Sequence, residues 1–259
     1  MSILTLITDF GTDDYYIGAM KGVTLGIAPD ARLIDISHQI PPQDVLAAAF
    51  VLRHAAREFP PGTVHLGVVD PGVGTARRPI AVATDDHFWI GPDNGLFSFV
   101  LNDARVYHIT NKALYSPRPS HTFHGRDIFA PIAAHLCAGL DLAAVGPPIH
   151  DPVILPEIAA QKSAERITGQ IIHIDHFGNL VTNIAAADIE PWGTAVSIRL
   201  GNYVLTGLSR TYGDVAKDAA LALIGSIDLL EISVNGGSAA QRFGIDRRDP
   251  IVVEPTTGR

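Results

Sequence analysis

The segment TVHLGVVDPGVGTARR, residues 63–78, begins with a nearly continuous apolar run that ends at Asp70. A run of this kind, without polar alternation, predicts a strand buried on both faces, as in the parallel sheets of α/β proteins. A Pro-Gly turn, a flexible loop and two adjacent arginines follow it. Because ligands of open α/β sheets bind outside the carboxyl ends of the strands, Asp70 is predicted to lie at a binding edge.

The alternation of apolar strands and helix-like segments extends over the first 150 residues. Residues 3–10 and 31–37 predict further strands, and residues 15–29 and 44–59 predict helices. We therefore predict an α/β N-terminal domain, residues 1–150, with a mostly parallel sheet flanked by helices. Asp9, Asp35 and Asp70 are all predicted at carboxyl ends of its strands.

The sequence pattern changes after residue 150. Residues 151–165 show no clear period and predict a linker. From residue 166 to 259, short β-like pieces are separated by glycine and asparagine. This pattern predicts a smaller all-β, barrel-like C-terminal domain.

Composition argues against several classes of function. The 259 residues carry a net charge of −8 without a Lys/Arg block, whereas nucleic-acid binding needs a basic surface. The sequence contains no run of 18 apolar residues, so it predicts no membrane-spanning helix. Cys137 is the only cysteine, so no disulfide can form within the chain. The first residues lack the features of a signal peptide, and we expect a cytoplasmic protein with no membrane partner.

The loop after Asp70 invites a phosphate-binding hypothesis. It lacks the lysine of a P-loop, and no G-x-G-x-x-G motif follows the first strand, so this hypothesis is weak. An acid at the ligand edge is poorly placed for packing, and Asp70 with Arg77 is therefore a candidate for chemistry. For Arg78 we favour the simpler interpretation of an exposed arginine in a turn.

His124 lies in TFHGRDIF, residues 122–129, just before a predicted helix. Backbone N–H groups at a helix N-terminus attract negative charge, so this position could hold an anionic nucleophile. For Arg126 and Asp127 a local salt bridge is the expected role.

Acidic residues also follow the first strand, in TDFGTDDYY, residues 8–16. The carboxylate of Asp9 could accept both hydrogen bonds of a ribose diol. Asp13 or Asp14 is predicted to cap the following helix.

Two motifs in the C-terminal part could contact a ligand. Asp175, His176 and Asn179 lie in IDHFGNLVTNI, residues 174–184, which could also be only a hairpin turn. In GSIDLLEISVNGGSAA, residues 225–240, Ser226 and the turn at residues 235–237 could approach a ligand through backbone atoms.

The residues alone leave three function classes open. A metal-dependent hydrolase is suggested by eleven histidines and several acids, but spacings such as H-E-x-x-H are absent. A metal-free enzyme that acts on a nucleoside-like cation suits the acidic balance. A non-catalytic module that senses such a compound is the third class.

Together these motifs resemble the family of S-adenosyl-L-methionine (SAM) hydroxide adenosyltransferases, the adenosine-forming SAM hydrolases, which are related to SAM-dependent fluorinases and chlorinases. The resemblance follows the motifs in order over essentially the whole chain. It implies hydrolysis of SAM to adenosine and L-methionine by in-line attack of water or hydroxide at ribose C5′. It also implies no cofactor and no metal, and a homotrimer with active sites at subunit interfaces.

The resemblance assigns roles to particular residues. Asp70, Arg77 and His124 correspond to the catalytic set, and Asp9 to the ribose contact. The remaining substrate-binding residues are expected to contact the methionine part (Asp14, Asp175 and Ser226), the adenine (Asn179, Asn235 and Gly236) or the ligand as a packing surface (Tyr212).

A 5′-halogenase and a non-catalytic adenosyl-ligand sensor remain as alternatives. The halogenating relatives are expected to carry an aromatic residue at the position of Asp70, and a carboxylate there would repel a halide. They also place an aromatic residue at Gln43 and a polar contact at Ile227, so this chain departs from their pattern at three positions.

Overall fold

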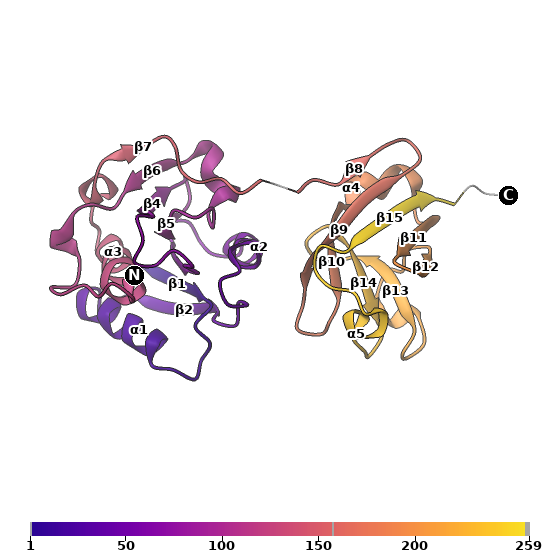
Figure 1. Cartoon of the computed structure of the whole chain (residues 1–259), viewed down its shortest axis with the longest axis horizontal. Coiled ribbons are helices and arrows are strands. Elements are labelled where there is room, and N and C mark those ends of the chain that lie inside the picture. The colour runs from indigo at the N-terminus through magenta and orange to yellow at the C-terminus, as the bar shows by residue number, and fades with distance from the viewer. Residues whose placement is uncertain (1, 157, 257–259) are drawn as a thin grey trace. The chain divides into compact units, whose positions relative to one another are not determined.

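The computed structural model describes residues 2–156 and 158–256, and the chain divides into two compact units, the first of which ends at Pro156. Figure 1 shows the strands and helices of both units. The first unit contains β1 (Ile3–Thr8), α1 (Tyr16–Ile27), β2 (Arg32–Ser37), α2 (Val45–Ala56), β3 (Val64–Val68), β4 (Pro79–Ala83), β5 (Phe88–Pro92), β6 (Arg105–His108), α3 (Ala130–Cys137) and β7 (Pro148–Ile149). Its shorter helical turns are η1 (Ser98–Asp103), η2 (Lys112–Leu114), η3 (Gly125–Phe129) and η4 (Leu142–Val145).

The sheet of the first unit has the order β2-β1-β3-β5-β4-β6-β7. β1 pairs in parallel with β2 and β3, and β3 with β5, whereas β4 is antiparallel to β5 and β6, and β6 is antiparallel to β7. The sheet is therefore mixed, and the prediction of a mostly parallel sheet was wrong. A parallel connection needs a crossover of about a dozen residues or more, but only residues 84–87 join β4 to β5.

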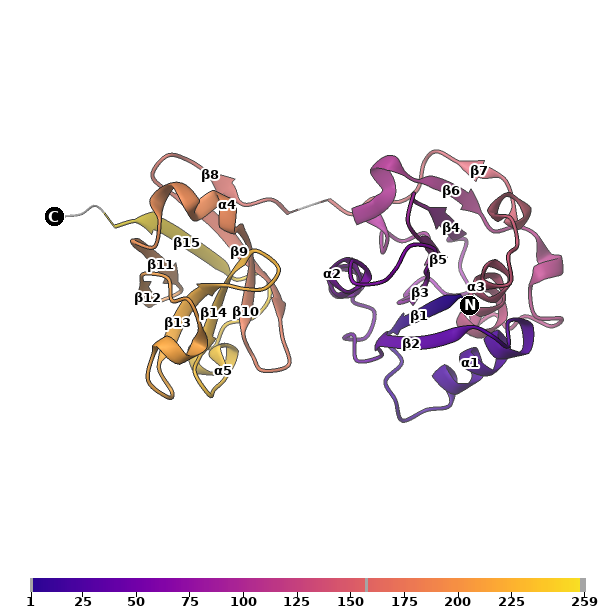
Figure 2. The same cartoon turned by 180° about the vertical axis from the view of Figure 1, so that it is seen from behind.

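Helices cover both faces of this sheet (Figures 1 and 2). On one face, Leu66 packs in a buried cluster with Met20 of α1 and Ile132 of α3. On the other, Ile7 packs in a second cluster with Leu52 of α2. Burial on both faces explains why the central strands β1, β3, β4 and β5 are mostly apolar rather than alternating, whereas β2 at the edge of the sheet is exposed or half-buried.

Two local predictions near the binding edge were wrong. Asp35 lies inside β2 rather than at its end, and its carboxylate binds Lys21 Nζ at 2.6 Å. Neither Asp13 nor Asp14 caps α1, because the cap position falls on Tyr15, whose backbone is already helical and whose side chain makes no capping bond. Asp9 and Asp70 do follow the ends of β1 and β3.

The second unit is an antiparallel, nearly barrel-shaped sheet of eight strands. β12 and β13, the two ends of its strand path, lie against each other, and Ile171, Ile198 and Ile232 are fully buried inside. Its elements are β8 (Gln161–Lys162), β9 (Ile167–Ile174), β10 (Leu180–Ala185), α4 (Ala186–Ile189), η5 (Glu190–Trp192), β11 (Val196–Leu200), β12 (Tyr203–Thr206), η6 (Tyr212–Asp214), β13 (Ala220–Ile224), β14 (Leu229–Val234), α5 (Ala239–Phe243) and β15 (Pro250–Pro255).

A buried histidine lies near the start of β3, at the edge of the sheet opposite to Asp70. His65 Nδ1 is 2.7 Å from Thr5 Oγ1, and its ring stacks on Trp89 with the centroids 4.4 Å apart. His65 is fully buried, and its Nε2 has no hydrogen-bond partner among the described residues. Burial, with a smaller contribution from His87, lowers the pKa of His65 to about 3.

This histidine should make the first unit sensitive to acid. Below pH 6.5 the unfolded chain takes up a proton at His65 that the folded chain does not, so the free energy of unfolding falls by up to about 1.4 kcal/mol per pH unit toward pH 3. Urea unfolding at several pH values checks this. His65→Phe keeps an aromatic ring and should flatten the dependence between pH 6 and 4, roughly the centre of that window. Equal slopes in both proteins would contradict the prediction.

Candidate active site

An acid, a guanidinium and an imidazole lie together at the carboxyl end of β3. Arg77 Nε donates to Asp70 Oδ1 at 2.9 Å and to Oδ2 at 3.0 Å, and Arg77 Nη2 also donates to Oδ2. The same Nη2 lies 2.8 Å from His124 Nδ1. The side chains of Asp70 and Arg77 are only 5% and 10% exposed. Arg77 therefore connects the other two groups in a nearly buried cluster.

The loop between Asp70 and Arg77 folds back through two turns. Val73 N–H donates to the Asp70 carbonyl, and Thr75 N–H donates to the Gly72 carbonyl. Gly74 has φ +77°, and a Cβ there would lie 2.7 Å from the carbonyl oxygen of His121. The glycine thus lets this loop pack directly against the segment that carries His124. The bendable sequence brings an acid and an arginine seven positions apart into contact.

His124 immediately precedes a π-helical turn, Gly125–Phe129, and π turns are frequent at functional sites. Burial lowers the pKa of His124, the Arg77 guanidinium lowers it further, and Asp70 acts in the opposite direction. Because a guanidinium has no acceptor, Nδ1 of His124 must accept the bond from Arg77. The neutral ring therefore carries its proton on Nε2.

Asp9 and Asp14 lie in the loop between β1 and α1. Asp9 Oδ2 accepts a hydrogen bond of 2.7 Å from the backbone N–H of Gln43, which holds the carboxylate after the strand end. Asp14 is exposed just before α1. These two acids belong to the same unit as the Asp70–Arg77–His124 cluster.

The other predicted residues belong to the second unit, where a cavity of about 570 Å³ gathers four of them. Asp175 accepts from the side-chain and backbone N–H groups of Asn179, both at 2.8 Å. Tyr212 and Gly236 complete this set. The predicted hairpin turn is present, and it also places Asp175 and Asn179 in the lining of the cavity.

Ser226 and Asn235 lie outside the lining of that cavity. Ser226 is exposed in the turn after β13, and the side-chain amide of Asn235 donates to the Val215 carbonyl at 2.9 Å. Asn235 nevertheless directly precedes Gly236, whose φ of +76° shapes the turn at the cavity.

Two further residues were missed by sequence reasoning. Phe177 lines the cavity and is 74% exposed, and its place in the hairpin tip beside Asp175 was the available signal. Glu231 is 8% exposed and accepts from the Tyr212 hydroxyl at 2.7 Å. Burial, together with this bond, raises the pKa of Tyr212 to about 12. No local pattern marks a buried acid in an apolar strand.

Arg126 and Arg78, two arginines close to the cluster residues in sequence, have structural partners. Arg126 binds its neighbour Asp127 at 2.7 Å, which confirms the predicted salt bridge. Arg78 was expected to be exposed, but it is half-buried between Asp93 and Asp151, each 2.7 Å away. Asp93 comes from the turn after β5, a contact that local sequence does not reveal.

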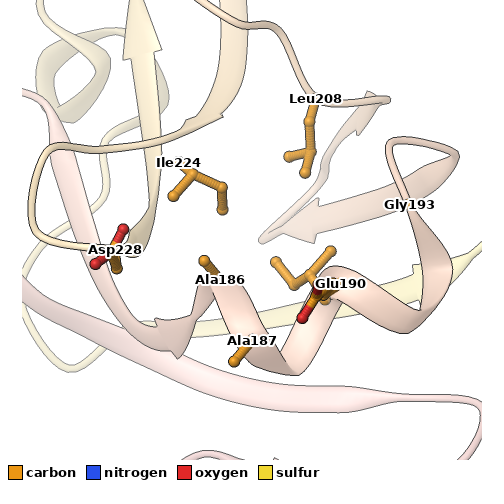
Figure 3. Close-up of a pocket in the computed structure, with 8 residues that line it drawn as sticks. Ala186, Ala187, Glu190, Gly193, Leu208, Ile224 and Asp228 are labelled. Carbon is orange, nitrogen blue, oxygen red and sulfur yellow. The ribbon is translucent and has the colours of Figure 1, made fainter.

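A second cavity, of about 480 Å³, also lies in the second unit. Figure 3 shows alkyl side chains such as Leu208 and Ile224 pointing into it, with Glu190 and Asp228 at its border. None of the predicted site residues lines it. Among the described residues, no group of three or more histidine, cysteine or acidic side chains could hold a metal ion, and none of their helices is long and apolar enough to span a membrane.

A hydrogen-bonded acid, guanidinium and imidazole at the ligand edge of an α/β unit, in a chain that also carries a cavity with polar residues in its lining on a β-rich unit, is typical of an enzyme that acts on a small molecule. Models of the SAM hydroxide adenosyltransferase N-terminal and C-terminal domains match residues 4–146 and 169–252. The chain belongs to the SAM hydroxide adenosyltransferase family.

Relatives span almost the full chain. The (R)-S-adenosyl-L-methionine hydrolase of Salinispora tropica is 38% identical, with 96% of this chain and 97% of the relative covered. A fluorinase of Nocardia brasiliensis is 28% identical, with 94% and 93% covered. A solved structure of an uncharacterized conserved protein from Thermotoga maritima has a TM-score of 0.91 at 36% identity, covering 96% of this chain and 99% of that one. The hydrolase is thus more similar to this chain than the fluorinase is.

Proposed function

We propose that this protein hydrolyses SAM to adenosine and L-methionine, with Asp70, Arg77 and His124 as its catalytic residues. The observation that carries the proposal is the hydrogen-bonded Asp70–Arg77–His124 cluster at the ligand edge of the first unit. The similarity to SAM hydrolases over the full chain supports it.

The reaction forms one bond and breaks one. Oxygen from water or hydroxide bonds to ribose C5′ while the C5′–S bond breaks. The electron pair of the broken bond stays on sulfur, and methionine leaves as a neutral thioether. The leaving group therefore needs neither a proton nor a metal. Exclusion of bulk water strengthens the attraction between hydroxide and sulfonium, whose charges cancel in the transition state.

Only one member of the cluster can accept the proton that water loses. Arg77 has no acceptor, and His124 uses Nδ1 for Arg77 and carries its proton on Nε2. Asp70 is left as the acceptor, so its carboxylate orients the water and takes the proton before releasing it to solvent. His124 Nε2–H and Arg77 can stabilise the hydroxide that results.

Substrate contacts are proposed on both units. Asp9 would bind the ribose diol, and Asp14, Asp175 and Ser226 would contact the methionine part. The adenine and the ligand surface would contact Asn179, Tyr212, Asn235 and Gly236. The family resemblance implies a homotrimer in which each site joins the first unit of one subunit to the second unit of its neighbour, and we propose that arrangement for this protein. The protein is proposed to be cytoplasmic and to need no cofactor.

The proposed function is tested by incubating metal-stripped protein with SAM and separating the products by chromatography. We expect equimolar adenosine and methionine, unchanged by added Mg²⁺ or Zn²⁺, because the leaving thioether is already neutral. A parallel incubation with fluoride or chloride serves as the control for halogenation. Products that require a metal or a halide, or SAM binding without turnover, would contradict the proposal.

A further inference from the structure

A buried histidine outside the Asp70–Arg77–His124 cluster links two loops at the ligand edge. His38 follows β2, is 6% exposed, and lies with Nδ1 2.9 Å from the hydroxyl of Thr8, the last residue of β1. Its carbonyl accepts a 2.8 Å bond from the N–H of Gly11. His38 therefore contacts the chain on both sides of Asp9.

The hydrogen-bond directions around Thr8 follow from its single proton. The Phe10 N–H donates to Thr8 Oγ1 at 3.2 Å, so that oxygen is an acceptor for the backbone. The hydroxyl proton is then free to be donated to His38 Nδ1. In this arrangement the ring proton lies on Nε2, which is 3.0 Å from Asp35 Oδ1 but has no hydrogen-bond partner among the described residues.

The chain of contacts continues to a cation. Asp35 Oδ2 lies 2.6 Å from Lys21 Nζ, so a lysine, an acid, an imidazole and a hydroxyl connect α1, β2 and β1. The buried contact between Thr8 and His38 is the part of this chain of contacts that constrains side-chain orientation, because Lys21 and Asp35 are partly exposed and His38 Nε2 has no hydrogen-bond partner among the described residues. Here the part that it fixes is the start of the loop that carries Asp9.

The same pair of loops also contacts Asp9 directly. Gln43, from the loop that begins at His38, donates its backbone N–H to Asp9 and has a left-handed φ of 64°. Such a conformation is costly for a residue with a side chain and marks places where function constrains the backbone. The Asp9 carboxylate is thus held by Gln43, while Thr8 and Gly11, on either side of Asp9 in the chain, are held by His38.

We propose that His38 is a positioning residue: through Thr8 and Gly11 it holds the Asp9 carboxylate where it can bind the diol of a ribose. The inference rests on the proposed function for the identity of the substrate. It requires no contact between His38 and the substrate, and it places the effect in binding rather than in the chemical step.

The test measures KM and kcat for SAM, and in parallel the Kd of adenosine by calorimetry. His38→Ala and the nearly isosteric Thr8→Val should each raise KM and Kd about tenfold, as for the loss of one hydrogen bond, with kcat within about threefold of the unaltered protein. His38→Asn retains an acceptor for Thr8 and should restore Kd to within about threefold. His87→Asn, at the opposite edge of the sheet, is the control and should change none of these values.

A background that lacks the Asp9 charge separates positioning from general damage. In Asp9→Asn protein, His38→Ala should weaken adenosine binding less than about twofold further, because the group that it positions is already altered. Additive losses, a fall in kcat with KM unchanged, or unchanged Kd in folded variants would each overturn the inference. If the unaltered protein binds adenosine but does not hydrolyse SAM, the proposed function fails while the adenosine measurements still decide the role of His38; if it binds no adenosine, both fail.

Discussion

Asp70→Asn is expected to slow SAM hydrolysis about 10²–10⁴-fold while leaving the Kd for SAM within about threefold. The amide keeps the size of the side chain and an oxygen for Arg77 Nε, but it cannot take a proton from water. Since Arg77 and His124 offer no free acceptor in the cluster, no neighbouring group can replace Asp70. Single-turnover rates and calorimetric SAM binding measure the two quantities separately.

A matched control for this variant is Asp151→Asn, which alters an acid that also binds an arginine, Arg78, but is 80% exposed and outside the cluster. Its rate should equal that of the unaltered protein. A normal rate in Asp70→Asn would remove Asp70 from the chemical step, and weakened SAM binding at a normal kcat would make it a binding residue instead.

Central strands of the first unit such as β1 and β3 could be predicted because burial on both faces leaves a plain signal, a nearly continuous apolar run. The direction of β4 could not be read from such a run, which looks the same in either orientation; only the short turn before β5 decides it. Asp35 was wrongly predicted at the carboxyl end of β2, because an apolar run does not reveal where the pairing of a strand stops. Asp9 and Asp70 were placed correctly because their predicted positions depended only on where β1 and β3 end.

The cluster itself could be predicted only in part. Asp70 and Arg77 are close in sequence and a loop rich in glycine allows their contact, but nothing local brings His124 to them across 47 positions. The family resemblance supplied that grouping. His38 and Glu231 were missed for the same physical reason. Their partners, Thr8 in β1 and Tyr212 in η6, are distant in sequence, and a single buried polar residue has no periodic signature.

Arg77→Met is expected to lower the free energy of unfolding of the first unit by about 3–5 kcal/mol, because it leaves a buried carboxylate without its counter-charge. The arginine also stacks over Phe129 at 5.1 Å, a contact that the methionine can partly replace. Urea unfolding measures the change, in a Trp192→Phe background in which Trp89 alone reports on the first unit. For comparison, Asp151→Asn removes an exposed partner and should change the free energy of unfolding much less.

Adding Asp70→Asn to Arg77→Met should restore much of the lost stability, because the unpaired charge is then removed from the interior. Hydrolysis should not recover, since the double variant lacks both the proton acceptor and the guanidinium that orients it. The second substitution would thus raise the free energy of unfolding without restoring activity. The stability lost in the double variant is compared with the losses in Arg77→Met and in Asp70→Asn measured separately. If it equals their sum, the carboxylate is not held in place by Arg77, and the arrangement in which one guanidinium joins Asp70 to His124 has to be abandoned.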